Sequence, residues 1–269
     1  MTLPLLTKSN VRVEKRVNVS DDNLIFVLVR HFAGCFGSFV LFSTALIQQV
    51  AANPAEGFDL NIAPLADVVG QPPLQGSEAL KRDLDIMRWQ QFSRDSALVG
   101  HTWGYLDREI GRFQSAIGSG LTKTAPTIRS GVPQFVHLVD EVKDKLKNAI
   151  GRPRPFLSHG DLKPCLPREY SKSYPSGHSA WYVTTSLLLA DLLPDRRERL
   201  LKVGRQGMAA RVTCGMHYPS DVEAGQRLAE AAALQIISSV QWKQFKASVK
   251  DEVRALMTPP SAGLPVVYD

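Results

Sequence analysis

Apolar residues recur every three or four positions along most of the chain after residue 76, and charged residues fill many of the positions between them. This pattern is typical of helices that bury one face. It is clearest from Val132 to Ile150, after which Gly151 and Pro153 act as stop signals. Residues 53–76 are rich in proline and glycine instead, so we expect an irregular lead-in there.

The other predicted helices cover about 77–92, 95–117, 177–193, 195–212 and 220–250. Ser176 is the expected N-cap of the helix from Gly177, and Ser220 with Glu223 is the expected capping box of the last one. The proline-rich connection at 155–175 is expected to be a long ordered loop, and no segment alternates as a strand does. We therefore predict an all-α fold: a compact single-domain helical bundle with the active site at helix ends and in the connecting loops.

The N-terminal segment has features of an export signal. Arg30 and His31 precede an apolar stretch from Phe32 to Ile47, and Val50 and Ala52 satisfy the small-residue rule for cleavage. The polar lead before Arg30 is long for a signal, and an uncleaved membrane anchor is the alternative. The expected division of the chain is a polar lead plus signal peptide or anchor at 1–52, the lead-in at 53–76 and an all-helical domain at 77–269. The expected location is periplasmic or secreted.

The composition is that of an ordinary folded protein. Of the 269 residues, 44% are hydrophobic and 22% are charged, with a formal net charge of +6. We see no basic run interleaved with aromatic residues, so we do not expect nucleic-acid binding. After residue 52 no segment is long and apolar enough to span a bilayer, so no stable membrane insertion of the mature chain is expected. Cys165 and Cys214 remain there, as a disulfide or as two buried free thiols.

Cations near a predicted helix end are the first candidate chemistry. Lys147 and Arg154 are seven positions apart, and Arg211 lies at the end of a later helix. Alone, Lys147 and Arg154 would be an ordinary solvated basic face. Together the three cations could neutralise the oxygens of a transferring phosphoryl group, and the planar fork of arginine donates to two oxygens at once.

The motif Pro175-Ser176-Gly177-His178 places a capping serine and a glycine at a helix start. Backbone amides and the helix dipole favour an anion at such a position, and Gly177 lets it approach the main chain. His178 then lies in the first turn. Taken by itself, the motif is better explained as a helix cap with an incidental histidine.

His217 and Asp221 are four positions apart across a turn into a helix. A carboxylate at that spacing can accept a hydrogen bond from one imidazole nitrogen, which leaves the other unprotonated, as a nucleophile requires. The alternative is that Asp221 only caps its helix. The sequence shows no thiolate pair or carboxylate cluster at metal-ligand spacing, so no metal or cofactor is expected. The remaining histidines lack such partners and are expected to be non-catalytic: His31, His101, His137 and His159.

These motifs resemble the superfamily of type 2 phosphatidic acid phosphatases and vanadium haloperoxidases, and within it the class A bacterial non-specific acid phosphatases. The resemblance rests on 173–179, SYPSGHS, and on 211–222, RVTCGMHYPSDV, and it extends from about Val132 to Leu234. Ala210 stands where the usual pattern has serine, which affects a minor contact and not the phosphate clamp.

The resemblance implies that His217 attacks phosphorus to form a phosphohistidine, that Asp221 orients it, and that His178 protonates the leaving alcohol and then activates water. It implies that the phosphate oxygens are held by Lys147, Arg154, Ser176, Gly177 and Arg211. The implied enzyme is a periplasmic, metal-independent acid phosphatase for small-molecule phosphate esters, and a homo-oligomer is consistent with the family. Because His178 must carry a proton, mildly acidic pH is expected to favour activity.

Three other functions fit part of the pattern: a vanadium haloperoxidase with vanadate in the same clamp, a membrane-associated lipid phosphatase or pyrophosphatase, and a non-catalytic phosphate-binding protein. The residues that flank the motifs favour the phosphatase class over the first. The lack of further apolar spans after residue 52 argues against the second. The presence of His178, His217 and Asp221 together argues against the third.

Overall fold

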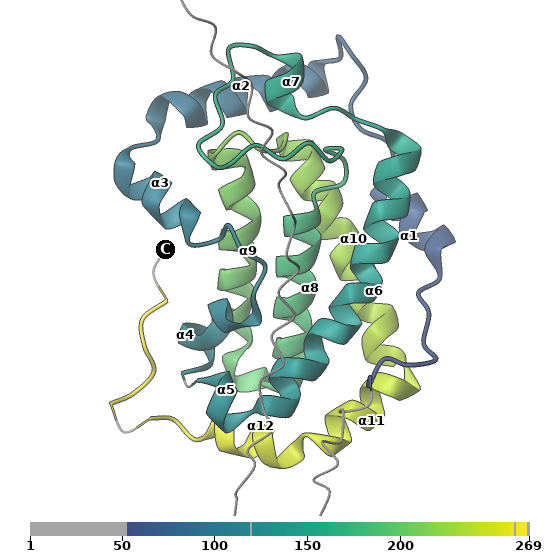
Figure 1. Ribbon diagram of the computed structural model, residues 1–269, viewed down its shortest axis with the longest axis vertical. Helices are drawn as coiled ribbons and strands as arrows, with labels where there is room; N and C mark the ends of the chain where they lie inside the picture. The colour runs from purple at the N-terminus through teal and green to yellow at the C-terminus, as the bar shows by residue number, and fades with distance from the viewer. Residues whose placement is uncertain (1–52, 119, 261, 268–269) are drawn as a thin grey trace, which may run out of the picture. The chain divides into compact units, whose positions relative to one another are not determined.

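The computed structural model describes residues 53–118, 120–260 and 262–267, and within those ranges it contains helices and no strand (Figure 1). This confirms the predicted all-α class. No described helix is both long enough and apolar enough to cross a bilayer. The predicted signal or anchor at 1–52 lies outside the described residues.

The main helices of the described part are α1 Ile62–Val69, α2 Glu78–Ser93, α3 Ser96–Trp103, α6 Pro126–Ile150, α8 Gly177–Leu192, α9 Arg197–Thr213, α10 Pro219–Ser238, α11 Val240–Ser248 and α12 Lys250–Met257. Short helical turns connect them: η1 Ile110–Phe113, α4 Gln114–Ile117, α5 Leu121–Thr124, α7 Pro155–Ser158 and η2 Pro194–Arg196.

Helix α8 is buried on nearly every side and packs against α6, α9 and α10. Its apolar and small residues occur all round the helix instead of on one stripe. Two of the hydroxyls that this places in the core are satisfied within the helix, whereas Thr184 Oγ1 has no partner among the described residues. Thr185 Oγ1 donates to the Trp181 carbonyl at 2.7 Å, and Ser186 Oγ donates to the Val183 carbonyl at 2.8 Å. Helix α8 is therefore the core element around which the others are arranged.

Two glycines let neighbouring helices approach α8 closely. A Cβ at Gly207 of α9 would lie 2.2 Å from Tyr182 Cγ, and a Cβ at Gly225 of α10 would lie 2.5 Å from the Ser176 carbonyl oxygen. Both distances are well inside van der Waals contact, so a side chain at either position would push its helix away. Gly225 thereby keeps α10 against the start of α8.

Four helix ends meet at one end of this bundle (Figure 1). Helices α6 and α9 end there, and α8 and α10 begin there. Helix α2 and the connection between α6 and α8 lie across the same end, where Arg88 of α2 donates to Asp161 at 2.8 Å. The three sequence motifs lie on these ends, so the antiparallel arrangement brings them together.

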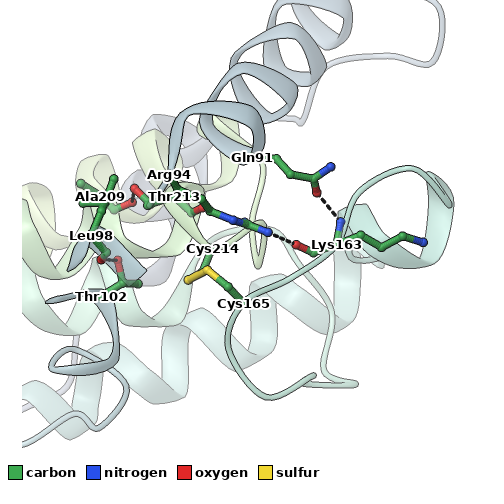
Figure 2. Close-up of a disulfide and its surroundings, with 9 residues drawn as sticks. All are labelled: Gln91, Arg94, Leu98, Thr102, Lys163, Cys165, Ala209, Thr213 and Cys214. Atoms are coloured by element: carbon green, nitrogen blue, oxygen red, sulfur yellow. Dashed lines mark hydrogen bonds between the residues drawn. A yellow bond between two sulfur atoms is a disulfide. The ribbon is translucent and has the colours of Figure 1, made fainter. Parts of the chain in front are cut away.

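A disulfide ties the connection between α6 and α8 to the end of α9 (Figure 2). Cys165 and Cys214 are bonded, with Cα atoms 4.7 Å apart, and the Cys165 amide donates to the Cys214 carbonyl at 3.1 Å. Arg94 of α2 donates to the carbonyl of Thr213 at 3.0 Å and to that of Lys163. Of the two alternatives that the sequence left open, the structure has the disulfide.

Several predicted boundaries were wrong, and each error has a local cause. Helix α6 begins at Pro126, because Glu252 of α12 accepts hydrogen bonds from the amides of Thr127 and Ile128 at 2.9 and 2.8 Å and so caps its start. The last predicted helix is three helices, since Ser239 is extended and accepts from the Trp242 amide at 3.1 Å, which starts a new helix.

The remaining differences concern the segments rich in glycine and proline. The lead-in at 53–76 contains α1, and the loop at 155–175 contains α7. The predicted helix at 95–117 is divided into α3, η1 and α4. The capping box predicted at Ser220 is not formed: α10 begins two residues after His217, at Pro219, and its first-turn acceptor is Asp221.

Candidate active site

A small pocket of about 90 Å³ opens where the four helix ends meet. Five predicted site residues line it: Lys147, Arg154, Gly177, His178 and His217. Four other residues complete its wall: Arg108, Lys143, Glu169 and Ser171. Two predicted phosphate ligands, Ser176 and Arg211, are not part of the wall.

His217 lies at the turn between α9 and α10 and is only 1% exposed. Arg154 Nη1 is 2.6 Å from its Nε2. A guanidinium can only donate, so Nε2 is the acceptor and carries no hydrogen. In the neutral ring the hydrogen is therefore on Nδ1, which lies 3.3 Å from Asp221 Oδ2. Burial, followed by the charges of Arg154 and Lys147, holds the pKa of His217 well below its usual value.

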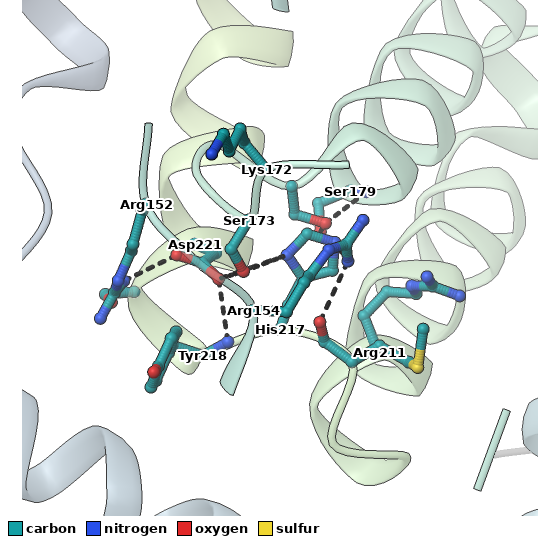
Figure 3. A network of polar contacts seen from close by, with 12 residues as sticks. Arg152, Arg154, Lys172, Ser173, Ser179, Arg211, His217, Tyr218 and Asp221 are labelled. Atoms are coloured by element: carbon teal, nitrogen blue, oxygen red, sulfur yellow. Dashed lines mark hydrogen bonds and ion pairs between the residues drawn. The ribbon is translucent and has the colours of Figure 1, made fainter. Parts of the chain in front are cut away.

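Asp221 has a full set of donors on the Nδ1 side of His217 (Figure 3). Its Oδ2 accepts from the Tyr218 amide at 3.0 Å and from Ser173 Oγ at 2.5 Å, and its Oδ1 accepts from Arg152 Nη1 at 2.6 Å. Burial raises the pKa of Asp221, while Arg152 and the Ser173 hydroxyl oppose that effect. The carboxylate is thus fixed where it can hold the Nδ1 hydrogen of His217.

Arg152 is held in place by three partners besides Asp221. Its guanidinium stacks over the Tyr218 ring at 3.8 Å from the centroid and donates to Ser220 Oγ at 2.8 Å. It also pairs with Asp83 of α2 at 3.5 Å. Asp83 in turn accepts from the Ser220 amide at 3.1 Å, so it fixes both Arg152 and the start of α10.

Arg154 is buried and uses every guanidinium nitrogen. Besides His217, it donates to the carbonyls of Ser171 and Met216 at 2.9 and 3.0 Å and to Ser171 Oγ at 2.9 Å. Its Nη2 donates to Glu169 Oε2 at 2.7 Å. These contacts place a permanent cation beside Nε2 of His217, and both residues line the pocket.

Arg211 is fully buried at the end of α9, and its Nη2 pairs with Glu169 Oε1. Its Nε and Nη1 find no hydrogen-bond partner among the described residues. A buried donor without a partner costs about 1–3 kcal/mol. The arrangement is therefore incomplete at this residue, in contrast to Asp221 and Arg154.

Lys147 lies in the last turn of α6 and points toward the connection before α8. Its Nζ donates to the Lys172 carbonyl and contacts the Ser173 carbonyl at 3.4 Å. Burial, followed by repulsion from Arg154, lowers the pKa of Lys147 to about 7. Its charge is therefore sensitive to pH near neutrality.

His178 lies in the first turn of α8 and donates from Nε2 to the Leu106 carbonyl at 2.8 Å, since a carbonyl can only accept. Nδ1 of His178 is therefore the nitrogen that can exchange a proton with a ligand. Burial and the charge of Arg211 lower the pKa of His178 to about 3. His178 is thus neutral at mildly acidic pH.

Ser176 and Gly177 begin α8, as the sequence predicted. Ser176 Oγ accepts from the Ser179 amide at 3.3 Å and from Ser179 Oγ at 2.9 Å, so its hydroxyl is engaged as a helix cap. A Cβ at Gly177 would lie 2.9 Å from Lys143 Cδ. A side chain at this position would displace the Lys143 side chain, which lines the same pocket.

In the ranges described, no group of three or more His, Cys, Asp or Glu side chains is arranged to hold a metal ion. The independence of metals stays a prediction.

A comparison with protein-family models finds that residues 133–245 match the PAP2 superfamily. The matched segment contains all the predicted catalytic and phosphate-binding residues. Residues 133–245 form a PAP2 superfamily domain. The resemblance inferred from the motifs is thereby confirmed for the superfamily.

Several proteins similar to this chain carry acid phosphatase names. A non-specific acid phosphatase of Providencia stuartii is 30% identical over 151 residues, which are 54% of this chain and 60% of that protein. An acid phosphatase of Zymomonas mobilis is 28% identical over 217 residues, which are 72% of this chain and 79% of that protein. A non-specific acid phosphatase of Salmonella typhimurium is 36% identical over 108 residues, which are 38% of this chain and 42% of that protein.

The first and third of these matches span less than two thirds of the relatives' lengths. Among solved structures, a transmembrane PAP2-type phosphatidylglycerolphosphate phosphatase of Bacillus subtilis aligns over 70% of this chain and 94% of that chain. Its identity is 22% and its TM-score is 0.47.

Sequence reasoning missed several residues that shape the site of the PAP2 domain. Arg152 and Lys143 had a usable signal, since Arg152 precedes Arg154 by two positions and Lys143 lies one helical turn before Lys147. Ser173 stands inside a quoted motif but was given no role. Glu169 and Asp83 carried no local signal, because their partners are distant in the sequence.

Proposed function

We propose that this protein is an acid phosphatase that hydrolyses small-molecule phosphate monoesters in the pocket at the helix ends. The observation that carries the proposal is the state of His217: its Nε2 is unprotonated and faces Arg154 beside a pocket lined by cations. The names of the Providencia and Zymomonas relatives support the same reaction.

In the proposed first step, the Nε2 lone pair of His217 attacks phosphorus. The N–P bond forms as the ester P–O bond breaks, and His178 gives a proton from Nδ1 to the leaving oxygen. The Nδ1 hydrogen of His217 stays on the hydrogen bond to Asp221, which balances the charge that develops on the ring. Arg154 turns from Nε2 to the phosphate oxygens as the substrate enters.

In the proposed second step, His178 takes a proton from a water molecule whose oxygen attacks the phosphohistidine. The O–P bond forms, the N–P bond breaks, and Nε2 regains its lone pair while inorganic phosphate is released. Each residue thus returns to its starting protonation state. No metal ion takes part in either step of this proposal.

The electrostatics of the resting pocket change the expected origin of the acidic pH preference. The sequence argument assigned it to a protonated His178, whose pKa in the ligand-free protein is about 3. We propose that the ester binds as its monoanion and passes its proton to Nδ1 of His178, and that the phosphate dianion this leaves in the pocket raises the pKa of His178. Lys147, with a pKa of about 7, is the group whose charge is present below neutral pH and lost above it.

The decisive experiment is an assay of purified protein with p-nitrophenyl phosphate across pH, with and without EDTA. We expect turnover that EDTA leaves unchanged and that His217→Ala lowers by roughly 10⁴-fold or more. The matched control is His137→Ala, because His137 is an exposed histidine on α6. No turnover by the wild type on any phosphate monoester, or full activity of His217→Ala, would refute the proposal.

The role of His178 has its own test. A poor leaving group needs a proton more than nitrophenolate does, so His178→Ala should slow alkyl phosphates more than nitrophenyl phosphate. An equal loss for both substrates would remove His178 from the acid step.

We also propose that the chain works outside the cytoplasm, in the periplasm or as a secreted protein. The Cys165–Cys214 disulfide supports this, since such bonds persist in oxidising compartments. Fractionation of producing cells tests it: activity confined to the cytoplasm would contradict the proposal. An assembly of identical chains stays a prediction for light scattering.

A further inference from the structure

Glu169 occupies the place where the two arginines of the clamp converge. Its Oε2 accepts from Arg154 Nη2 at 2.7 Å and its Oε1 accepts from Arg211 Nη2. Each carboxylate oxygen thus takes one guanidinium, as two oxygens of a phosphate could. Glu169 also lines the pocket, whereas Arg211 does not.

The carboxylate satisfies Arg211 only in part. Nε and Nη1 of this fully buried arginine have no hydrogen-bond partner among the described residues. The Glu169 carboxylate is planar, and its two oxygens contact Nη2 of Arg154 and Nη2 of Arg211 but not Nε or Nη1 of Arg211. A tetrahedral oxyanion brings more oxygens in three dimensions, so it can reach donors that Glu169 leaves unpaired.

Glu169 is held less firmly by its surroundings than the groups it pairs with. Its side chain is 34% exposed, against 1% for Arg154 and 0% for Arg211. The neighbouring Arg168 and Tyr170 are exposed as well, so a Glu169 side chain that turns outward enters solvent and not the core. Another anion can therefore reach the position of the Glu169 carboxylate from the pocket that Glu169 lines.

We propose that Glu169 is an internal anion that occupies the phosphate position of the resting site and that a phosphate group must displace it to bind. The inference rests on the proposed phosphatase function and adds a regulatory property to it. The apparent affinity for phosphate is then the intrinsic affinity reduced by the fraction of molecules in which Glu169 has turned away. Product phosphate meets the same competitor, so its release is favoured.

The charge on this competitor is constant over the working pH range. Burial raises the pKa of Glu169, but the charges of Arg211 and Arg154 outweigh burial and lower the pKa to about 2. Acidification to mildly acidic pH therefore leaves Glu169 ionised and in place. Displacement depends on the concentration and charge of the incoming anion.

The test measures the Kd of inorganic phosphate by titration calorimetry for the wild type and for Glu169→Gln. The amide has nearly the same shape but no charge, and its NH₂ group would face a guanidinium. We expect Glu169→Gln to bind phosphate about tenfold more tightly. Glu230→Gln is the matched control, because Glu230 is exposed on α10 with a single glutamine partner, and its Kd should equal that of the wild type.

An unchanged or weaker affinity of Glu169→Gln would overturn the inference, because Glu169 would then only orient the two arginines. Glu169→Asp provides a second variant: its shorter side chain keeps the charge but cannot reach both guanidiniums, so it should also tighten phosphate binding. If Glu169→Gln does not fold, as judged by its thermal unfolding transition, the aspartate variant decides.

Turnover of p-nitrophenyl phosphate by the wild type separates this inference from the proposed function. Wild-type hydrolysis without tighter phosphate binding by either variant refutes the role of Glu169 alone. Phosphate binding that tightens in the variants without any hydrolysis refutes the phosphatase and keeps the role of Glu169. If neither the wild type nor either variant binds phosphate or turns over an ester, both are refuted.

Discussion

The two nitrogens of the His217 ring face environments of opposite character. On the Nδ1 side, Asp221 accepts from several donors, one of which is Arg152, and every group in the network has a protein partner. On the Nε2 side, Arg211 keeps two buried donors unpaired, and a partly exposed Glu169 carboxylate bridges the cations. One half of the site is complete without a ligand, and the other half is not.

This difference assigns separate tasks to the two halves. The Nδ1 half fixes the tautomer and orientation of the ring before any substrate arrives, so it acts on the rate of the chemical step. The Nε2 half supplies charge that a ligand completes, so it acts mainly on the affinity for phosphate. Substitutions in the two halves should therefore separate kcat from Kd.

The largest effect is expected for Asp221→Asn on the Nδ1 side. An amide cannot balance the charge that develops on His217, so kcat should fall by roughly 10²–10⁴-fold. The Kd of inorganic phosphate should change by less than about threefold, since the cations are untouched. Asp251→Asn, an exposed carboxylate on α12, is the control. A rise in Kd as large as the fall in kcat would erase the distinction between the halves.

The next largest effect is expected for Arg211→Ala on the Nε2 side. Two charge-assisted hydrogen bonds to a bound phosphate are worth about 3 kcal/mol together, which is about 100-fold in Kd. The measurement is calorimetric titration with phosphate, compared with Arg205→Ala at an exposed position of α9. Unaltered phosphate affinity would mean that Arg211 is only a structural partner of Glu169.

Removal of the disulfide tests whether the Nε2 half depends on the connection between α6 and α8 being held in place. Cys165 and Cys214 are 49 positions apart, so their replacement by serine should lower the free energy of unfolding by about 2–4 kcal/mol. The loop they tie down carries Ser171, whose carbonyl and Oγ hold Arg154. Phosphate affinity should therefore also fall, by about threefold to tenfold, which corresponds to the loss of about one hydrogen bond. Denaturant unfolding and calorimetry measure the two effects. An unchanged free energy of unfolding would contradict the role of the bond.

The smallest effect is expected from the titration of Lys147. With a pKa of about 7, Lys147 is charged below that pH and loses its charge above it, so phosphate binding weakens as the pH rises through neutrality. In Lys147→Arg the charge persists, and the alkaline fall of kcat/KM should move to higher pH. The ratio of the wild-type and Lys147→Arg pH profiles of kcat/KM cancels the contribution of substrate ionisation, which is the same for both proteins. Lys145→Arg on the exposed face of α6 is the control. Parallel profiles would exclude Lys147 as the titrating group.

A comparison of the two halves also explains which features could be predicted from the sequence. The bundle was predictable because helix periodicity is local, and Ser176 at the start of α8 was predictable because a capping serine acts three residues away. His217 with Asp221 is equally local, at a spacing of four. These features are decided within a few turns of the chain.

The features that escaped prediction depend on long-range partners. Glu252 caps α6 from a position 125 residues away, and Asp83 reaches Ser220 across 137 residues. Glu169 meets Arg211 across 42 residues only because the connection before α8 folds over the end of α9. No local spacing encodes these contacts, so the Nε2 half of the site was recovered only in part from its motifs.

The most direct test of the central claim is to identify the phosphorylated residue during turnover. Wild-type protein and His178→Ala would be mixed with p-nitrophenyl phosphate, quenched in alkali within milliseconds to seconds, and analysed by peptide mass spectrometry. We predict a phosphoryl group on His217, at higher occupancy in His178→Ala because the attack of water is slowed, and none in His217→Ala. Turnover with no phosphorylated His217 at any time, or with the phosphoryl group on another residue, would contradict the account.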